Sequence, residues 1–202
     1  MFNLCKLVEQ YRLIVVDIDN TLFNYTLAHT LALKNVLAKY QINSRDYDLA
    51  RREIHSRNLS ANQHKKELYF KVICENNGLH FSKARDMFEL YTNSFIENLK
   101  VDKTLFNFLS YAKDLNKNVI AITNFYFIEQ INKLKKAKLD HLIDYLVCSE
   151  EFELEKPNNA LIDRALKLVN ERIEERDVLV IGDSDIDESL AYAWGGGEIL
   201  SL

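Results

Sequence analysis

The pattern of apolar and polar positions divides the chain into three parts. Near the start, Leu13 to Val16 form an uninterrupted apolar run of mostly β-branched residues, which is typical of a buried strand. From residue 24 to about residue 100, apolar positions recur at intervals of three and four, which indicates helices. After that point, short apolar runs alternate with amphipathic segments, so we expect strands to alternate with helices.

The middle part predicts a small helical bundle. One apolar helix face recurs over residues 33–40 and another over residues 84–95. Residues 60–63 have the spacing of a capping box, which predicts the start of a further helix. We find no convincing strand between residues 24 and 100, so this part is expected to be an insertion after the first strand. The expected domains are residues 1–23 together with 100–202, and residues 24–99.

The last part completes an α/β domain. Apolar strands that alternate with amphipathic helices form right-handed crossovers, and these build a parallel sheet with helices on both faces. Expected strands are residues 118–123, 143–148, 177–182 and a short 198–201, and the helices between them are marked by apolar positions within 105–112, 127–134 and 162–173.

Composition narrows the class of protein. The 202 residues are 48% hydrophobic and 28% charged, as in an ordinary soluble globular protein. The net charge of −4 gives no general attraction to nucleic acid or to anionic membranes. Three widely spaced cysteines form neither a zinc pattern nor a disulfide framework. Because there is also no secretory signal and no apolar run of 18 residues, we expect a cytoplasmic protein without membrane or nucleic-acid partners.

Polar residues follow each of the first four strands where the strand ends. Asp17 and Asp19 follow the first strand, and Thr123 with Asn124 follows the second. Lys156 comes after the third strand and a loop, and Asp183 comes directly after Gly182 at the end of the fourth. In a parallel sheet these ends share one edge, which is where open α/β folds bind ligands. The sequence therefore predicts a reaction centre at this edge.

Each of these positions also has a simpler interpretation. Asp17 and Asp19 are ordinary turn residues, and Thr123 is an ordinary hydroxyl at a strand end. Lys156 follows the acidic run 150–155 and pairs with it in the simpler view. The first turn of a helix explains Asp187 or Glu188, but it explains Asp183 poorly, because that residue directly follows a buried strand. A calcium loop does not fit, because Glu188 replaces the required glycine. Their convergence from four strands favours function. Carboxylates from two strand ends suit Mg²⁺, which takes few protein ligands. The lysines of residues 133–138 are expected on the solvated face of their helix.

Taken together, these residues resemble the four motifs of the haloacid dehalogenase-like hydrolase superfamily. The order of the motifs matches, the resemblance covers nearly the whole chain, and a helical insertion after the first motif resembles the family's first cap type. Asn20 departs from the glycine that many relatives carry. The matching residues are Asp17, Asp19 and Thr21 of the first motif, Thr123 of the second, Lys156 with Pro157 of the third, and Gly182, Asp183 and Asp187 of the fourth.

The resemblance implies a Rossmann-like core and a role for each residue. Asp17 would attack phosphorus and form an aspartyl-phosphate, and Asp19 would act as general acid and then as general base. Thr123, Asn124 and Lys156 would hold the phosphoryl group, with Lys156 also neutralising charge in the reaction. Mg²⁺ would be held by Asp17, the backbone carbonyl of Asp19, and Asp183. Thr21, Gly182 and Asp187 would support the site, with Glu188 as the alternative to Asp187 at the longer motif spacing.

The expected activity is Mg²⁺-dependent hydrolysis of a small phosphorylated metabolite. Dehalogenases lack an acid at the position of Asp19, because they have no alkoxide leaving group to protonate. A phosphomutase of the same superfamily and a non-catalytic phosphate- or metal-binding module are the alternatives. The sequence leaves open which phosphomonoester is used, which residues of the insertion contact it, and the oligomeric state.

Overall fold

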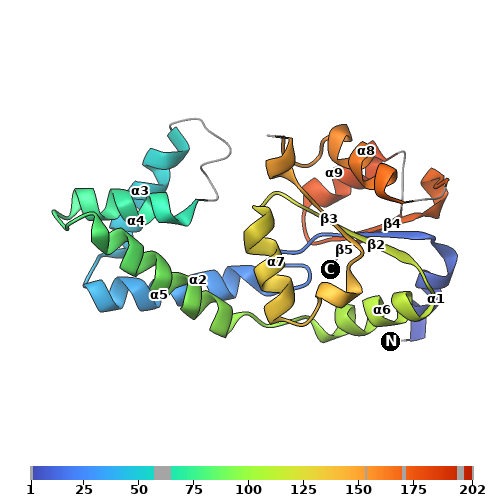
Figure 1. Ribbon diagram of the computed structural model, residues 1–202, viewed down its shortest axis with the longest axis horizontal. Coiled ribbons are helices and arrows are strands. Elements are labelled where there is room, and N and C mark those ends of the chain that lie inside the picture. The colour runs from blue at the N-terminus through green and yellow to red at the C-terminus, as the bar shows by residue number, and fades with distance from the viewer. Residues whose placement is uncertain (1, 57–64, 153, 170–171, 195–197, 202) are drawn as a thin grey trace. The chain divides into compact units, whose positions relative to one another are not determined.

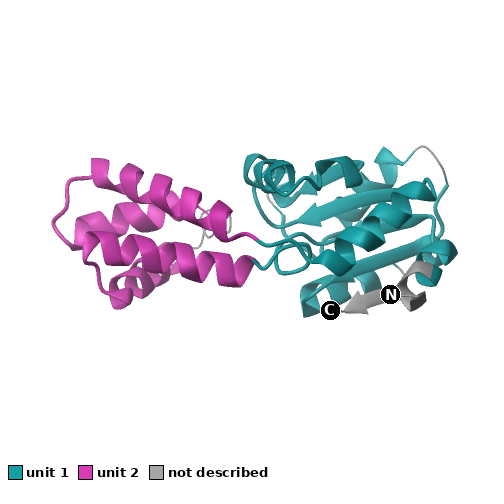
Figure 2. Ribbon diagram, turned by 90° about the horizontal axis from the view of Figure 1, so that it is seen from below, with its two compact units in different colours: residues 1–24, 100–202 teal, residues 25–99 magenta. Residues whose placement is uncertain are grey.

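The chain forms two compact units. The computed structural model describes residues 2–56, 65–152, 154–169, 172–194 and 198–201. Unit 1 comprises residues 1–24 and 100–202, and unit 2 comprises residues 25–99 (Figure 2). The expected capping box at residues 60–63 lies outside the described residues. Within the described part of the chain, no helix has both the length and the apolar character needed to cross a membrane.

A parallel five-stranded sheet organises unit 1. Its strand order is β3-β2-β1-β4-β5, so β1, the strand that leads to the expected site residues Asp17 and Asp19, lies in the centre. Val16 at the end of β1 is paired with Ala121 of β2 on one side and with Ile181 of β4 on the other. The α/β class and the parallel sheet predicted from the sequence are therefore confirmed. The strands are β1 (Leu13–Val16), β2 (Asn118–Thr123), β3 (Tyr145–Cys148), β4 (Val178–Gly182) and β5 (Glu198–Ser201).

Helices cover both faces of this sheet (Figure 1). Helices α8 (Asn159–Leu168) and α9 (Asp185–Ala193) pack on one face, where alternate strand residues such as Leu13 and Val15 point. Helices α1 (Phe2–Gln10) and α6 (Lys103–Asp114) lie on the other face. Because helices cover both faces of the sheet, the side chains on both faces of β1 and β4 are buried. This explains the unbroken apolar runs in the sequence.

Several element boundaries differ from the sequence pattern. Helix α8 ends at Leu168, although the apolar spacing continued to Ile173. Strand β3 starts two residues later than its apolar run, because Asp144 uses its side chain to bind Lys113 and the Val119 N–H. Helix α1 was not predicted. Within the described residues, the connections also contain the short 3₁₀ helices η2 (Asp140–Leu142), η3 (Ser149–Glu151) and η4 (Glu175–Asp177).

Unit 2 is entirely helical where it is described. Its helices are α2 (Tyr25–Tyr40), α3 (Ser44–Ser56), α4 (Lys66–Asn76) and α5 (Ser82–Asn98). They enclose an apolar core that includes Val36, Phe70 and Met87. His29 of α2 lies among aromatic rings, with Nδ1 2.7 Å from the Tyr91 hydroxyl. Burial lowers the pKa of His29 to about 4, with Lys66 and Arg51 contributing, so the ring is neutral near pH 7.

Candidate active site

The first part of the site is the turn that follows β1. Asp17 continues the strand, and its N–H donates to the Ile181 carbonyl at 2.9 Å, which fixes this residue against β4. Asn20 has a φ of 66°, in the left-handed region that glycine and asparagine adopt most readily. That conformation explains why asparagine can stand where many relatives have glycine. The neighbouring Ile18 and Leu22 are fully buried and anchor the turn in the core.

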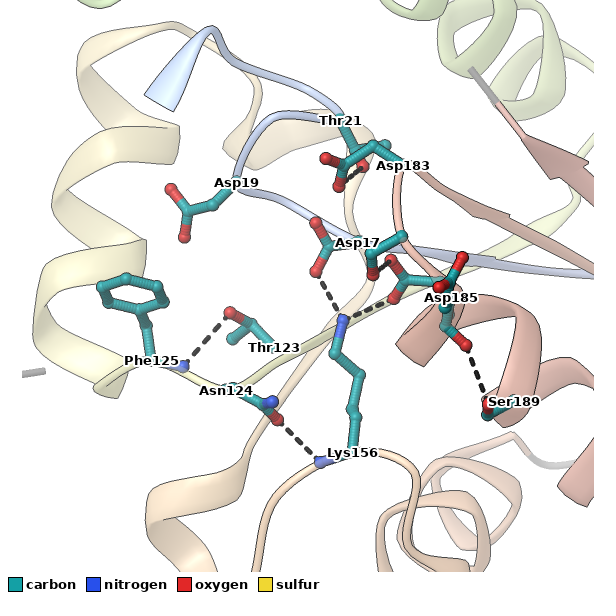
Figure 3. Close-up of polar contacts among 12 residues, drawn as sticks. Asp17, Asp19, Thr21, Thr123, Asn124, Phe125, Lys156, Asp183, Asp185 and Ser189 are labelled. Atoms are coloured by element: carbon teal, nitrogen blue, oxygen red, sulfur yellow. Dashed lines mark hydrogen bonds and ion pairs between the residues drawn. The ribbon is translucent and has the colours of Figure 1, made fainter. Parts of the chain in front are cut away.

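Lys156 lies between two carboxylates (Figure 3). Its Nζ is 2.5 Å from Asp17 Oδ1 and 2.6 Å from Asp187 Oδ1, and the lysine is only 8% exposed. The other oxygen of Asp187 accepts from the Ser184 hydroxyl at 2.6 Å. Lys156 therefore pairs with Asp17, which follows β1, and with Asp187 of α9. The simpler interpretation, in which this lysine pairs with the acidic run before it, is wrong.

The fourth motif brings Asp187 rather than Glu188 into the site. Asp187 is 2% exposed and bound to Lys156, whereas Glu188 is exposed. Gly182 makes this placement possible, because a Cβ at residue 182 would overlap the side chain of Asp187. The shorter of the two motif spacings is thus the one that the structure uses.

Asp183 joins Asp17 and Asp187 in an acidic group. Carboxylate oxygens of these three residues all lie within 4.8 Å of one another. Asp183 is the most exposed of the three, and its Oδ1 accepts from the Thr21 hydroxyl at 3.3 Å. The Asp19 carboxylate is not in this group. Of the residues expected to bind metal through a side chain, Asp17 and Asp183 are therefore brought together.

The electrostatics of this group favour a bound cation. Burial raises the pKa of Asp17 to about 6, with Lys156 opposing the rise and Asp187 adding to it. The pKa of Asp183 is raised as well, mainly by burial of its carboxyl and to a smaller extent by the negative charge of the neighbouring Asp187. Burial alone would lower the pKa of Lys156, but Asp17 and Asp187 outweigh it and raise that pKa. The lysine is therefore charged, and one ammonium does not neutralise three carboxylates.

A divalent cation fits the charge and the donor set. Within the described part of the site, the three carboxylates of the acidic group (Asp17, Asp183 and Asp187) face one ammonium group (Lys156), which leaves two negative charges. Both Asp187 oxygens already have donors, so the oxygens with room for a metal belong to Asp17 and Asp183. Carboxylate oxygens that leave space for water are the ligands Mg²⁺ prefers.

Thr123 and Asn124 lie at the end of β2. The Thr123 hydroxyl oxygen accepts from the Phe125 N–H at 3.3 Å and from Gln130 at 2.7 Å. Neither bond uses the hydroxyl proton, which leaves it for an anionic ligand. The Asn124 Oδ1 accepts from the Lys156 N–H at 2.7 Å, so this residue holds the lysine loop beside β2.

The Asp19 carboxylate is held by helix α7 (Phe127–Lys136). Lys133 Nζ is 2.7 Å from Asp19 Oδ1, and Gln130 Nε2 is 2.6 Å from Asp19 Oδ2. We expected Lys133 on the solvated face of its helix, and that prediction is wrong: Lys133 is 4% exposed, whereas Phe127 is 43% exposed. Leu134 of the expected apolar face is buried, and Gln130 and Lys133 are buried beside it, where they satisfy a carboxylate that would be costly to leave unpaired.

Sequence reasoning missed Gln130, Lys133 and Ser184 as members of the site. One available signal for the first two was their spacing of three residues, which places both on one helix face immediately after the second motif. Ser184 gave no signal apart from its position in the fourth motif. The expected residues that the structure brings to this edge of the sheet are Asp17, Asp19, Thr21, Thr123, Asn124, Lys156, Gly182, Asp183 and Asp187.

Comparison with known proteins gives consistent matches over most of the chain. A relative, ribulose-1,5-bisphosphate 5-phosphatase from Halopiger xanaduensis, is 24% identical over 195 residues, covering 89% of this chain and 79% of the relative. YfnB from Bacillus subtilis, solved with bound magnesium, superposes with a TM-score of 0.70 at 17% identity and covers 96% of this chain and 89% of its own.

A candidate β-phosphoglucomutase from Thermotoga maritima superposes with a TM-score of 0.73 at 18% identity, covering 94% of this chain and 84% of its own. At these identities the solved structures show a shared fold. The sequence itself matches the family described as haloacid dehalogenase-like hydrolase over residues 14–195. The match extends over both units, and the chain belongs to the haloacid dehalogenase-like hydrolase family.

Proposed function

We propose that the protein is a Mg²⁺-dependent phosphomonoester hydrolase that works through an aspartyl-phosphate on Asp17. The proposal is supported by the family, by the acidic group at the ends of β1 and β4, and by the lysine between its members. The observation that carries it is the state of the Asp17 carboxylate. One oxygen is bound to Lys156, and within the described residues no hydrogen bond is made to the other.

In the first step, an Asp17 oxygen attacks phosphorus while the bond from phosphorus to the ester oxygen breaks. Asp19 gives its proton to that leaving oxygen, so the alcohol departs neutral. Thr123 donates a hydrogen bond from its hydroxyl to a phosphoryl oxygen, and Lys156 offsets the charge that develops on the transferring group. Asp187 and Ser184 hold the lysine in place for this purpose.

In the second step, water attacks phosphorus and the bond from phosphorus to Asp17 breaks. Asp19, now ionised, takes a proton from the attacking water and regains the proton it lost in the first step. Inorganic phosphate leaves and Asp17 is regenerated as a carboxylate. One carboxyl group thus serves first as acid and then as base, and the reaction consumes one water for each ester cleaved.

Mg²⁺ would be held by the carboxylates of Asp17 and Asp183, and the family resemblance adds the backbone carbonyl of Asp19. Bound there, the ion would neutralise the two excess negative charges of the site and allow an anionic substrate to approach Asp17. Asp187 is not assigned to the metal, because both of its oxygens accept hydrogen bonds, one from Lys156 and one from Ser184. Its role is to hold the lysine in place.

Hydrolysis of a phosphate ester is favoured over other reactions of the fold because Asp19 is present. A dehalogenation has no alkoxide to protonate and no use for this acid. The phosphatase among the relatives is named for a phosphorylated sugar, which supports a small phosphomonoester as the substrate. Residues 25–99 are assigned to substrate choice on the family resemblance alone.

The test is phosphate release from a panel of sugar phosphates, nucleoside monophosphates and small organic phosphates. Wild type is compared with Asp17→Asn in Mg²⁺ and in a chelator, and Asp163→Asn on the exposed side of α8 is the matched control. We expect Mg²⁺-dependent release by wild type and the control, and at least a 10³-fold loss in Asp17→Asn, in line with the removal of a covalent nucleophile. Release that survives in Asp17→Asn would exclude it as the nucleophile, whereas isomerised product without release would indicate a mutase.

A further inference from the structure

Helix α7 buries a polar face beside the site. Gln130 is fully buried and Lys133 is 4% exposed, whereas Lys135 and Lys136 of the same helix are exposed. Lysine is almost never buried without a partner, because its charge must leave water. Two such residues three positions apart on one helix require a reason, and the family roles considered above use neither of them.

The contacts of these two residues converge on Asp19 and Thr123. Each Asp19 oxygen has its own donor, Lys133 for Oδ1 at 2.7 Å and Gln130 for Oδ2 at 2.6 Å. Gln130 Nε2 also donates to the Thr123 hydroxyl oxygen at 2.7 Å. The amide thus uses both of its protons, and it forms a bridge between the expected acid–base residue and the expected phosphate-binding hydroxyl.

Lys133 is itself held in place. Its Nζ lies 4.4 Å from the centre of the Phe125 ring, at a distance suited to a cation–π contact. The Phe125 N–H donates to the Thr123 hydroxyl oxygen at 3.3 Å, so the ring is part of the same turn. Asp19, Thr123 and the start of α7 therefore form one connected set of contacts, with Lys133 fixed from two sides.

We propose that Gln130 and Lys133 are positioning residues that set where the Asp19 carboxyl stands relative to Thr123. A phosphoryl group bound at Thr123 presents its leaving oxygen to Asp19 only if that separation is maintained, and the Gln130 bridge maintains it. Neither residue is assigned a contact with the phosphoryl group, and both act through the Asp19 carboxyl that they hold. This inference rests on the proposed function, since it assigns the geometry of one proton transfer within it.

A misplaced general acid affects esters unequally. An alkyl leaving group must be protonated as it departs, whereas a nitrophenolate leaves without a proton. General acid catalysis contributes about 10²- to 10⁴-fold, and small displacements remove a large part of it. The ratio kcat/KM reports on the steps up to release of the alcohol, so it isolates this proton transfer from the later hydrolysis of the intermediate.

The experiment compares kcat/KM for the best alkyl phosphomonoester of the panel and for p-nitrophenyl phosphate. Lys133→Met and Gln130→Met keep the side-chain length and remove the polar contacts to Asp19. Lys135→Met removes the same charge from the exposed side of α7 and is the matched control. Lys133→Arg keeps a donor for Asp19 and tests for rescue. Unfolding of each variant, followed by the fluorescence of the single, buried Trp194, shows whether unit 1 remains folded.

We expect Lys133→Met and Gln130→Met to lower kcat/KM for the alkyl ester about 10- to 100-fold and for p-nitrophenyl phosphate less than about threefold. Lys133→Arg should recover most of the alkyl activity, and Lys135→Met should match wild type. Equal losses on both substrates, or no loss, would overturn the positioning role while leaving the proposed function intact. Absence of Mg²⁺-dependent release by wild type would instead overturn the proposed function, and this inference with it.

Discussion

The site is expected to destabilise the fold when no metal is bound, and Asp17→Asn should reveal this. The raised pKa of Asp17 means that folding favours its protonated form. This contribution to stability is complete below the ordinary pKa of 3.8 and is lost as the pH rises through about 6. At about 1.4 kcal/mol for each pH unit between the two values, the ionised carboxylate costs about 3 kcal/mol at pH 7.5.

Asparagine is neutral at every pH and has nearly the same shape, so it avoids this cost. Lys156 keeps Asp187 as its partner at 2.6 Å, and no ammonium is left alone. We therefore expect Asp17→Asn to raise the free energy of unfolding of unit 1 by about 3 kcal/mol at pH 7.5 in a chelator. The gain should disappear below about pH 4, where wild-type Asp17 is protonated.

The assay is urea unfolding followed by Trp194 fluorescence, because this single tryptophan is buried in the core of unit 1 beside α8 and α9. Saturating Mg²⁺ should stabilise wild type and have little effect on the variant, since a ligand stabilises only the state that binds it. Asp163→Asn serves as the control for loss of an exposed charge. An Asp17→Asn variant that is no more stable than wild type in the chelator would refute the electrostatic account of the site.

Further predictions concern the lysine, the glycine and the histidine. Lys156→Met leaves two buried carboxylates without their cation, so unfolding in a chelator should become easier by about 3–5 kcal/mol; a change below about 1 kcal/mol would contradict the burial of this pair. Gly182→Ala should displace Asp187, lower the unfolding free energy by about 1–3 kcal/mol, and reduce phosphate release, whereas unchanged kinetics would show that the Cβ is accommodated. His29 has a depressed pKa of about 4, so its contribution to stability is complete above about pH 6.5 and is lost as the pH falls to about 4. Circular dichroism should therefore show wild type losing about 3 kcal/mol relative to His29→Gln over that range, and parallel curves would exclude the effect.

Strand ends could be predicted from the sequence because their signals are local. The run Leu13–Val16 is apolar on both faces, so it predicts a buried strand. A carboxylate directly after such a strand is expected at the edge of the sheet. Thr123 and Asp183 were predicted at the same edge because each of them also lies at the end of an apolar strand. Their convergence followed from the rule that parallel strands share one carboxyl edge, and the strand order of the structure agrees with it.

The burial of Lys133 could not be predicted, because its cause is distant in the sequence. Leu134 of the apolar face is buried as expected, but the ion pair of Lys133 with Asp19, which joins residues 114 positions apart, buries Lys133 beside it, while Phe127 is exposed. The choice between Asp187 and Glu188 depends likewise on helix phase. Adjacent residues point about 100° apart around a helix, and the fourth motif allows two spacings, so the sequence alone did not decide which acid faces Gly182 and Lys156.

The central claim is that Asp17 becomes covalently phosphorylated, and this can be measured directly. The protein is mixed with the best substrate of the panel, labelled in its phosphoryl group, and quenched in acid within one turnover. The quenched protein is then digested, and the peptide that carries the label is sequenced. The account predicts acid-stable, hydroxylamine-labile label on Asp17 in Mg²⁺, with no label in a chelator or in Asp17→Asn. Turnover of the substrate with label on another residue, or with no labelled peptide under any quench time, would contradict it.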